Sequence, residues 1–179
     1  MELRIAPLCR ENFIDAGKCK EPFGVFGRIV PMLKNGEWTY TEEILDRPYE
    51  KQYPDEEIDY ARYVGAQDRT VFLAYLDGKI AGQVTVREDW NRYALIEDIA
   101  VKASARRKGV GTALLNAAEK WAKQKELCGL SLETQDNNLA ACRLYAKFGF
   151  AIGGVNTMLY RNFGGPVADE TAVFWYKRF

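Results

Sequence analysis

The segment of this chain best suited to binding a charged ligand is 106–111, Arg-Arg-Lys-Gly-Val-Gly. It follows a strand-like run, 94–101, and opens a helical run, so its backbone amides should lie at a helix N-terminus. Gly109 and Gly111 allow successive N–H groups to approach phosphate oxygens without an intervening Cβ, and the helix dipole favours an anion there. The segment therefore predicts a binding site for a diphosphate.

The charge around this segment supports the same prediction. Residues 102–125 carry seven basic side chains and one acid, whereas the whole chain has a net charge of zero. A solvated basic face or a nucleic-acid patch are the alternatives. The segment is not the phosphate loop of nucleotide hydrolases, since no Gly-Lys-Ser/Thr follows, and it lacks the third glycine of the dinucleotide fingerprint. A polyanionic small molecule is therefore the favoured ligand.

A second segment, 138–150, completes a recognisable pair. The chain resembles the GNAT superfamily of N-acetyltransferases that use acetyl-coenzyme A, over roughly residues 70–160 and poorly over the first sixty. The first family motif, Arg/Gln-x-x-Gly-x-Gly/Ala, and the second, Asn with Ala, Tyr and Gly-Phe at fixed spacing, are matched in order by Arg106, Gly109, Gly111, Asn138, Ala141, Tyr145, Gly149 and Phe150.

The resemblance implies an α/β (α+β) fold. This is the GNAT fold, a central mixed, mostly antiparallel twisted sheet with helices on both faces and a splay between two central parallel strands. It also implies acetyl-CoA as cosubstrate, with no metal. The implied coenzyme contacts are Ile99, Ala100, Val101, Arg106, Arg107, Lys108, Gly109, Val110, Gly111, Thr112, Asn138, Ala141 and Tyr145.

Acetyl transfer to an amine needs a proton donor for the departing thiolate and a base for the amine. The Tyr145 phenol is the expected donor, with a packed aromatic as the alternative, and Asn138 is either a pantetheine ligand or a simple helix cap. Glu97 and Asp98 are consecutive acids in an apolar strand, and alternation predicts that they face opposite sides. One of them should reach the acceptor as the base, with Glu97 slightly favoured, although structural ion pairs would also explain both acids.

The acceptor is expected to be a cation. Residues 42–62 carry eight acids and resemble a loop that steers a cation, although a solvated acidic loop is the alternative. The sequence around Trp90-Asn91, Glu97 and Glu133 is similar to the streptothricin acetyltransferase branch of the superfamily, which modifies a β-lysine amine. These four residues are the expected acceptor contacts. For Glu133, a surface ion pair is the alternative. The alternatives are an enzyme that acts on a protein amine, a polyamine or an aminoglycoside, and an inert acyl-CoA-binding module.

Composition limits the remaining possibilities. The 179 residues, 47% hydrophobic and 28% charged, predict one globular domain over 1–179, with 1–65 on the acceptor side. The sequence has no histidine, which removes Ser-His and Cys-His nucleophiles and makes a zinc site improbable, and four cysteines without Cys-x-x-Cys spacing favour reduced thiols. No apolar run reaches the length of a membrane span. We expect a cytoplasmic protein without nucleic-acid or membrane partners, and leave the oligomeric state open, a homodimer included.

Local patterns predict the elements that hold these residues. Strands are expected at 3–6, 71–75, 80–84, 94–101, 130–134, 152–161 and 171–177, with a tight turn at Asp77-Gly78 and the last two strands pairing antiparallel. The helix after Gly109 should bury a stripe of Val110, Leu114, Ala117, Ala118 and Trp121. Asp136 or Asn137 should cap the next helix, which Gly149 should end.

Overall fold

The computed structural model describes residues 2–54 and 58–179. The chain forms two compact units, one made of residues 1–22, 52–130 and 178–179, and one made of residues 23–51 and 131–177. The single domain over 1–179 stays a prediction. No helix in the described ranges combines the length and the apolar character that crossing a membrane requires.

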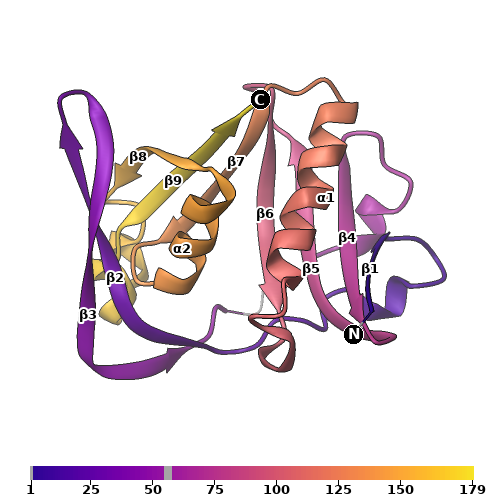
Figure 1. Ribbon diagram of the computed structural model, residues 1–179, viewed down its shortest axis with the longest axis horizontal. Coiled ribbons are helices and arrows are strands. Elements are labelled where there is room, and N and C mark those ends of the chain that lie inside the picture. Colours follow the sequence, from indigo (N-terminus) through magenta and orange to yellow (C-terminus); the bar gives the residue numbers. More distant parts are fainter. Residues whose placement is uncertain (1, 55–57) are drawn as a thin grey trace. The chain divides into compact units, whose positions relative to one another are not determined.

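The first unit is built on four strands in the order β1 (Leu3–Pro7), β4 (Arg69–Leu76), β5 (Lys79–Glu88) and β6 (Tyr93–Val101), each antiparallel to its neighbour (Figure 1). The predicted strands and the predicted tight turn are confirmed. Asp77 and Gly78 have φ values of 48° and 76°, and two positive φ angles are what a two-residue hairpin of type I′ requires.

Helix α1 (Val110–Gln124) covers one face of this sheet (Figure 1). A Cβ added to Gly82 of β5 would lie 3.0 Å from Val110 and 3.1 Å from Leu114, so the even-numbered residues of β5 face α1. The predicted apolar stripe is correct in part. Ala117 and Trp121 are only half-buried, because the helix turns a neighbouring line of residues towards the sheet. The buried residues are Val110, Leu114, Leu115, Ala118 and Ala122.

The opposite face of the same sheet packs against the N-terminal segment and against two short 3-10 helices, η1 (Phe13–Asp15) and η2 (Tyr60–Tyr63). A core of Leu8, Val71, Leu73 and Tyr75 lies there, with Tyr60 and Tyr63 packed against it. No element was expected at 58–68, and η2 brings two tyrosines to the face that α1 does not cover.

The second unit contains α2 (Leu139–Phe148), β8 (Ala151–Asn156) and most of β7 (Gly129–Gln135) and β9 (Ala172–Arg178), with β9 between β7 and β8. The predicted antiparallel pairing of the last two strands is confirmed. The expectation of a strand through residue 161 is wrong, because the chain leaves the sheet after Asn156. It then forms the short helices η4 (Arg161–Phe163) and η5 (Gly165–Asp169).

The second unit also holds a long antiparallel ribbon of β2 (Phe23–Lys34) and β3 (Glu37–Lys51) (Figure 1). Asn35 and Gly36, with φ values of 54° and 83°, form its two-residue turn. The expectation of an acidic loop over 42–62 is therefore wrong for residues 42–51, which belong to β3. Three of its acids, Asp55, Glu56 and Glu57, lie outside the described residues.

The start of α2 also differs from the prediction. Asn138 is the N-cap, and its side-chain oxygen accepts a hydrogen bond from the Ala141 amide at 3.3 Å. Asp136 and Asn137 lie before the cap, so the prediction that one of them caps the helix is wrong. Gly149 ends the helix in the left-handed conformation at φ 98°, as predicted.

Candidate active site

The predicted diphosphate site lies where β6 runs through η3 (Ala103–Ala105) and a short loop into α1. Gly109 is the N-cap of α1 at φ 82°, and no side chain caps this helix end. The Ala113 amide donates to the Gly109 carbonyl at 3.0 Å, so the amides of Val110, Gly111 and Thr112 precede the first intrahelical bond. A row of donor amides at a positive helix end fits an anion such as a diphosphate.

The three basic residues of this loop divide into two roles. Arg106 supports the loop, because its Nε donates to the Val101 carbonyl at 3.1 Å and its Nη2 to the Pro22 carbonyl at 2.8 Å. Arg107 and Lys108 are exposed, and Arg107 adopts φ 64°. Phosphate contact by these side chains stays a prediction, and Arg107 and Lys108 are the two that the structure leaves on the surface.

The strand residues predicted to line the coenzyme form the last part of β6. Ile99, Ala100 and Val101 are half-buried and pair in register with residues 84, 83 and 82 of β5. Gly82 cannot carry a larger side chain, since an added Cβ would lie 2.9 Å from the Ala100 carbonyl oxygen. This strand end is therefore firmly placed, and its contact with a coenzyme stays a prediction.

A β-bulge places the two consecutive acids of β6. Thr85 pairs with Asp98 and Val86 with Ile96, so Glu97 is an extra residue with no partner on β5. The expectation that the two carboxylates face opposite sides is wrong. Glu97 and Asp98 both bond to odd-numbered residues of β5, on the face opposite α1, because the bulge interrupts the alternation.

Glu97 is held by two partners. The Tyr63 hydroxyl donates to its Oε2 at 2.7 Å, and Arg87 Nε donates to its Oε1 at 2.9 Å. Burial, followed by the hydrogen bond to Glu97, raises the pKa of Tyr63 to about 12, so this phenol remains a donor at neutral pH. Both oxygens of the favoured base are thus engaged by neighbouring side chains.

Asp98 belongs to a second network centred on Gln83, a residue that the sequence analysis missed. Gln83 is completely buried. Its Oε1 accepts from the Gly17 amide at 2.8 Å, and its Nε2 donates to the Tyr60 hydroxyl at 2.9 Å and to Asp98 Oδ2 at 3.3 Å. A glutamine inside the apolar strand run 80–86 was the available signal.

The candidate residues of the second unit are placed by α2 and β7. Tyr145 is buried, with its ring centroid 5.9 Å from that of Phe150 and 6.1 Å from that of Trp175. Asn138 caps α2 through its side-chain oxygen, as the helix-cap alternative predicted. Roles of Tyr145, Asn138 and Ala141 towards a coenzyme stay predictions.

Among the residues that the structure describes, Glu133 has no partner for the exposed ion pair considered above. It is half-buried on β7 and accepts a hydrogen bond from the Tyr160 hydroxyl, which also accepts from Gln135 Nε2 at 3.1 Å. Burial raises the pKa of Glu133, and the bond from Tyr160 opposes that shift. Glu133 is therefore a shielded carboxyl group within the second unit.

The second unit also contains a hollow of about 530 Å³ bounded by β2, β3, the β7–α2 connection and η5. Next to it, Lys51 Nζ forms a buried ion pair with Glu170 at 2.6 Å, and Asn137 donates to the same carboxylate at 2.9 Å. Burial raises the pKa of Asp136, which accepts from the Thr171 amide at 3.0 Å. The charged residues lining the hollow are Arg28, Glu43, Asp136, Asp169 and Glu170.

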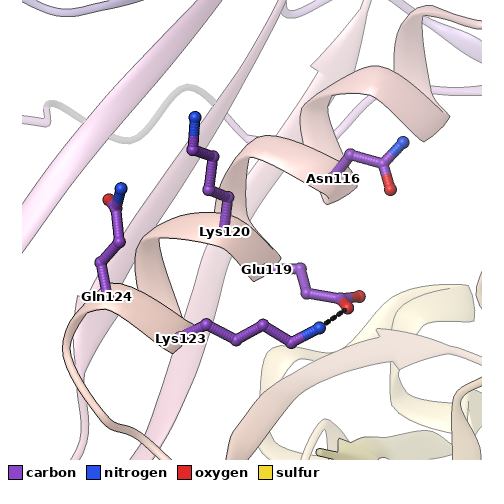
Figure 2. A pocket seen from close by; sticks show the side chains of 5 residues that line it. All are labelled: Asn116, Glu119, Lys120, Lys123 and Gln124. Carbon is purple, nitrogen blue, oxygen red and sulfur yellow. Dashed lines mark hydrogen bonds and ion pairs between the residues drawn. The ribbon is translucent and has the colours of Figure 1, made fainter.

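Another hollow, of about 440 Å³, lies along the solvent side of α1 (Figure 2). Lys123 and Glu119 form an ion pair at 2.6 Å there. None of its lining residues, Asn116, Glu119, Lys120, Lys123 and Gln124, is a predicted site residue. The predicted acceptor residues Trp90 and Asn91 lie in the β5–β6 turn instead, where Trp90 is 91% exposed and Asn91 accepts from the Tyr93 amide.

No group of His, Cys, Asp and Glu side chains in the described part of the chain could hold a metal ion. The candidate chemistry therefore consists of a helix end with free amide positions, paired carboxylates beside tyrosines, and a buried phenol on α2. These parts match what transfer of an acyl group to an amine requires: an anion site for a phosphorylated carrier, a base and an acid.

Comparison with known proteins agrees with this reading. Streptothricin acetyltransferase A of Bacillus subtilis (strain 168) is 54% identical over 168 residues, which are 94% of this chain and 95% of the relative. A streptothricin acetyltransferase of Escherichia coli is 39% identical over 72% of this chain and 70% of its own. A crystal structure from Bacillus anthracis, assigned as a streptothricin acetyltransferase and solved with acetyl coenzyme A, has a TM-score of 0.90 at 36% identity, covering 99% of this chain and all of the other.

The family profile matches most of the chain as well. The profile of the Acetyltransferase (GNAT) family covers residues 38–150, which include the Gly109 loop, the acids of the bulge and Tyr145. The comparisons together confirm the predicted fold class, while the splay between parallel strands stays a prediction. The chain belongs to the GNAT acetyltransferase family.

Proposed function

We propose that this protein transfers the acetyl group of acetyl-CoA to a primary amine of a cationic small molecule, the β-lysine amine of streptothricin, and thereby confers resistance to that antibiotic. The observation that carries the acetyl-CoA part is the α1 N-terminus, where Gly109 leaves donor amides without a side-chain cap. Two streptothricin acetyltransferases at 54% and 39% identity support the acceptor.

The coenzyme would bind with its diphosphate on the amides of Val110, Gly111 and Thr112, next to the exposed Arg107 and Lys108. Positive charge and oriented amides stabilise phosphate oxygens without any proton transfer. On the second unit, the Tyr145 phenol would give its proton to the thiolate sulfur as the carbon–sulfur bond breaks. Asn138 and Ala141 would bind the pantetheine arm at the start of α2.

The carboxylates of the bulge would supply the base. A primary ammonium has a reference pKa near 10.4 and is mostly protonated at neutral pH, so it must lose a proton before its lone pair can attack the thioester. Glu97 and Asp98 present two negative charges on one face, beside Tyr60 and Tyr63. These charges attract the ammonium ion and accept its proton, directly or through a water molecule.

Glu133, Trp90 and Asn91 are proposed acceptor contacts. The Trp90 indole is almost fully exposed and presents an aromatic face to a cation. A cytoplasmic location is also proposed, since coenzyme and antibiotic would meet inside the cell.

The decisive experiment is mass spectrometry of streptothricin incubated with the protein and acetyl-CoA. The proposal expects one added acetyl group on the β-lysine moiety, together with one free thiol per turnover. The same thiol-release assay with an aminoglycoside, spermidine and a lysine peptide at matched concentration tests the other acceptors. Turnover of one of these without turnover of streptothricin would overturn the acceptor, and coenzyme binding without turnover of any amine would overturn the enzymatic role.

A further inference from the structure

We infer that Gln83 is a positioning residue for the acceptor amine, and that it holds the Tyr60 hydroxyl and the Asp98 carboxylate together as the pair that receives the ammonium group. This inference rests on the proposed function and deepens it, because it names the side chains that select and deprotonate the amine.

The geometry of Gln83 carries the inference. Its Nε2 lies 2.9 Å from the Tyr60 hydroxyl oxygen and 3.3 Å from Asp98 Oδ2, so both oxygens are within reach of one nitrogen. In this inference, the ammonium nitrogen of the acceptor lies on the other side of these two oxygens, where it would donate to both. The third bond, from the Gly17 amide to Oε1 at 2.8 Å, fixes the orientation of the glutamine amide.

Burial explains why this arrangement is rigid. Gln83 is completely buried, and all its polar groups have partners on three different elements: the N-terminal segment, η2 and β6. A buried amide that lost these partners would pay the cost of desolvation, so the network is expected to keep one geometry. Tyr60 also contacts Gly17 closely, since a Cβ added to Gly17 would lie 3.2 Å from its ring.

The neighbouring carboxylate is less suited to the same task. Glu97 already pairs with the Arg87 guanidinium and accepts from Tyr63, so taking a proton would weaken an existing ion pair. Asp98 Oδ2 accepts a hydrogen bond from the neutral side-chain amide of Gln83. We therefore place proton acceptance on Asp98: the ammonium group transfers one proton to this carboxylate, and the neutral amine keeps the lone pair that attacks the thioester.

Two groups near Asp98, the Tyr60 phenol and the Cys19 thiol, remain neutral around neutral pH. From η2, Tyr60 has its pKa raised, mainly by burial. From the N-terminal segment, burial raises the pKa of Cys19 to about 11, and the charges of Lys102, Glu21, Asp98 and Asp15 also act on this thiol. On β6 and β5, the charged neighbours are Glu97 and its partner Arg87. The acidic limb of the pH profile for the acceptor should therefore report the carboxylate.

Thr85 offers a matched control. It lies on the same face of β5, two residues from Gln83, it is completely buried, and its hydroxyl has no hydrogen-bond partner among the described residues. Thr85→Val removes that hydroxyl at nearly constant volume. Any general disturbance of this strand should therefore appear in the control as well.

The test compares the Gln83→Glu, Tyr60→Phe and Thr85→Val variants with the unmodified chain, with streptothricin as acceptor. Gln83→Glu should lower kcat/KM for the acceptor at least tenfold and move the acidic limb of its pH profile upward by about one pH unit, because two adjacent carboxylates share protons. Tyr60→Phe should raise the acceptor KM several-fold. All three variants should keep the KM for acetyl-CoA, and Thr85→Val should keep the pH profile.

Each result counts for or against the inference. A Gln83→Glu variant that folds and keeps both the acceptor KM and the pH profile would overturn it, and so would a lower kcat without any movement of the acidic limb. If Gln83→Glu does not fold, an unchanged acceptor KM in Tyr60→Phe overturns the inference by itself. Failure of the proposed function would be seen separately, as absence of streptothricin turnover by the unmodified chain.

Discussion

Replacing Gly109 by alanine tests the diphosphate site directly. Gly109 adopts φ 82°, a left-handed conformation that costs an L-residue about 1–2 kcal/mol. An added Cβ at this position would meet nothing within 4 Å, so no steric clash adds to that strain. For a chain of this size, the loss corresponds to a fall in Tm of about 2–8 °C.

The functional effect should be larger than the effect on stability. An alanine that relaxes to a negative φ would turn the amides at the start of α1 away from the phosphate oxygens. Losing one hydrogen bond to a charged group costs about 1.5–3 kcal/mol, which corresponds to a rise in the KM for acetyl-CoA of roughly tenfold to a hundredfold. The KM for the acceptor should not change. Calorimetric titration with acetyl-CoA and steady-state thiol release measure the two effects.

Gly78→Ala is the matched control. Gly78 has φ 76° and equally open surroundings, but it lies in the β4–β5 turn. It should therefore lose a similar amount of stability while keeping the KM for acetyl-CoA. If both variants bind acetyl-CoA as the unmodified chain does, the helix end does not hold the diphosphate and the reasoning is refuted.

Three further predictions concern stability, measured by urea unfolding. Lys51→Met should lower the free energy of unfolding by about 3–5 kcal/mol, because Glu170, with its side chain 7% exposed, loses its cation. Replacing both partners by apolar residues should cost less than this single change, and an equal or larger cost would contradict the pairing argument. Gly27→Ala should cost about 1–3 kcal/mol, since its Cβ would lie 2.6 Å from a carbonyl oxygen of β3, whereas Gly24→Ala, with open space, should stay within about 0.5 kcal/mol. Glu133→Gln should gain stability relative to the unmodified chain as pH rises from about 4 to about 7. Because the pKa of Glu133 is raised in the folded state, its favourable contribution is present at low pH and is lost as pH rises through the folded-state pKa. A difference in stability that does not change with pH would contradict this.

The elements predicted correctly from the sequence are those with a strong local pattern. The Asp77-Gly78 turn and the strands on either side were predictable because that dipeptide favours positive φ angles. Helix α1 was predictable from its start at Gly109 and its apolar periodicity. The buried face of α1 was predicted only in part, because the burial of Leu115 and Ala122 depends on packing against the strands and not on the helix periodicity alone.

The β2–β3 ribbon was missed for a physical reason. Most of β3 is exposed on both faces, so its sequence lacks the alternation of apolar and polar residues that marks a half-buried strand. Asn35-Gly36 was the one local signal, and it has the same chemistry as the turn that was recognised. The charge-rich composition of residues 42–51 favoured a loop, although charged side chains are compatible with an exposed ribbon.

The candidate site shows the same division. Residues with motif spacing, such as Gly109 and Tyr145, could be selected from the sequence, because the spacing itself carries the information. Gln83 had a weaker signal, a polar residue inside an apolar strand, since its role depends on a contact with Tyr60, which lies 23 residues away in the chain. Asn138 lies between these cases: its position was selected, and the structure shows that its side-chain oxygen caps α2.

The bulge at Glu97 explains how two consecutive acids fit into a strand of this sheet. Ile96 pairs with Val86, an even-numbered residue on the face that α1 covers. In a regular strand, Asp98 would return to that apolar face, where an unpaired carboxylate costs several kcal/mol or remains protonated. The extra residue shifts Asp98 into register with Thr85, on the polar face beside η2. One inserted residue thus removes a folding penalty and brings two carboxylates to the same face of the sheet, where the proposed function places the acceptor amine.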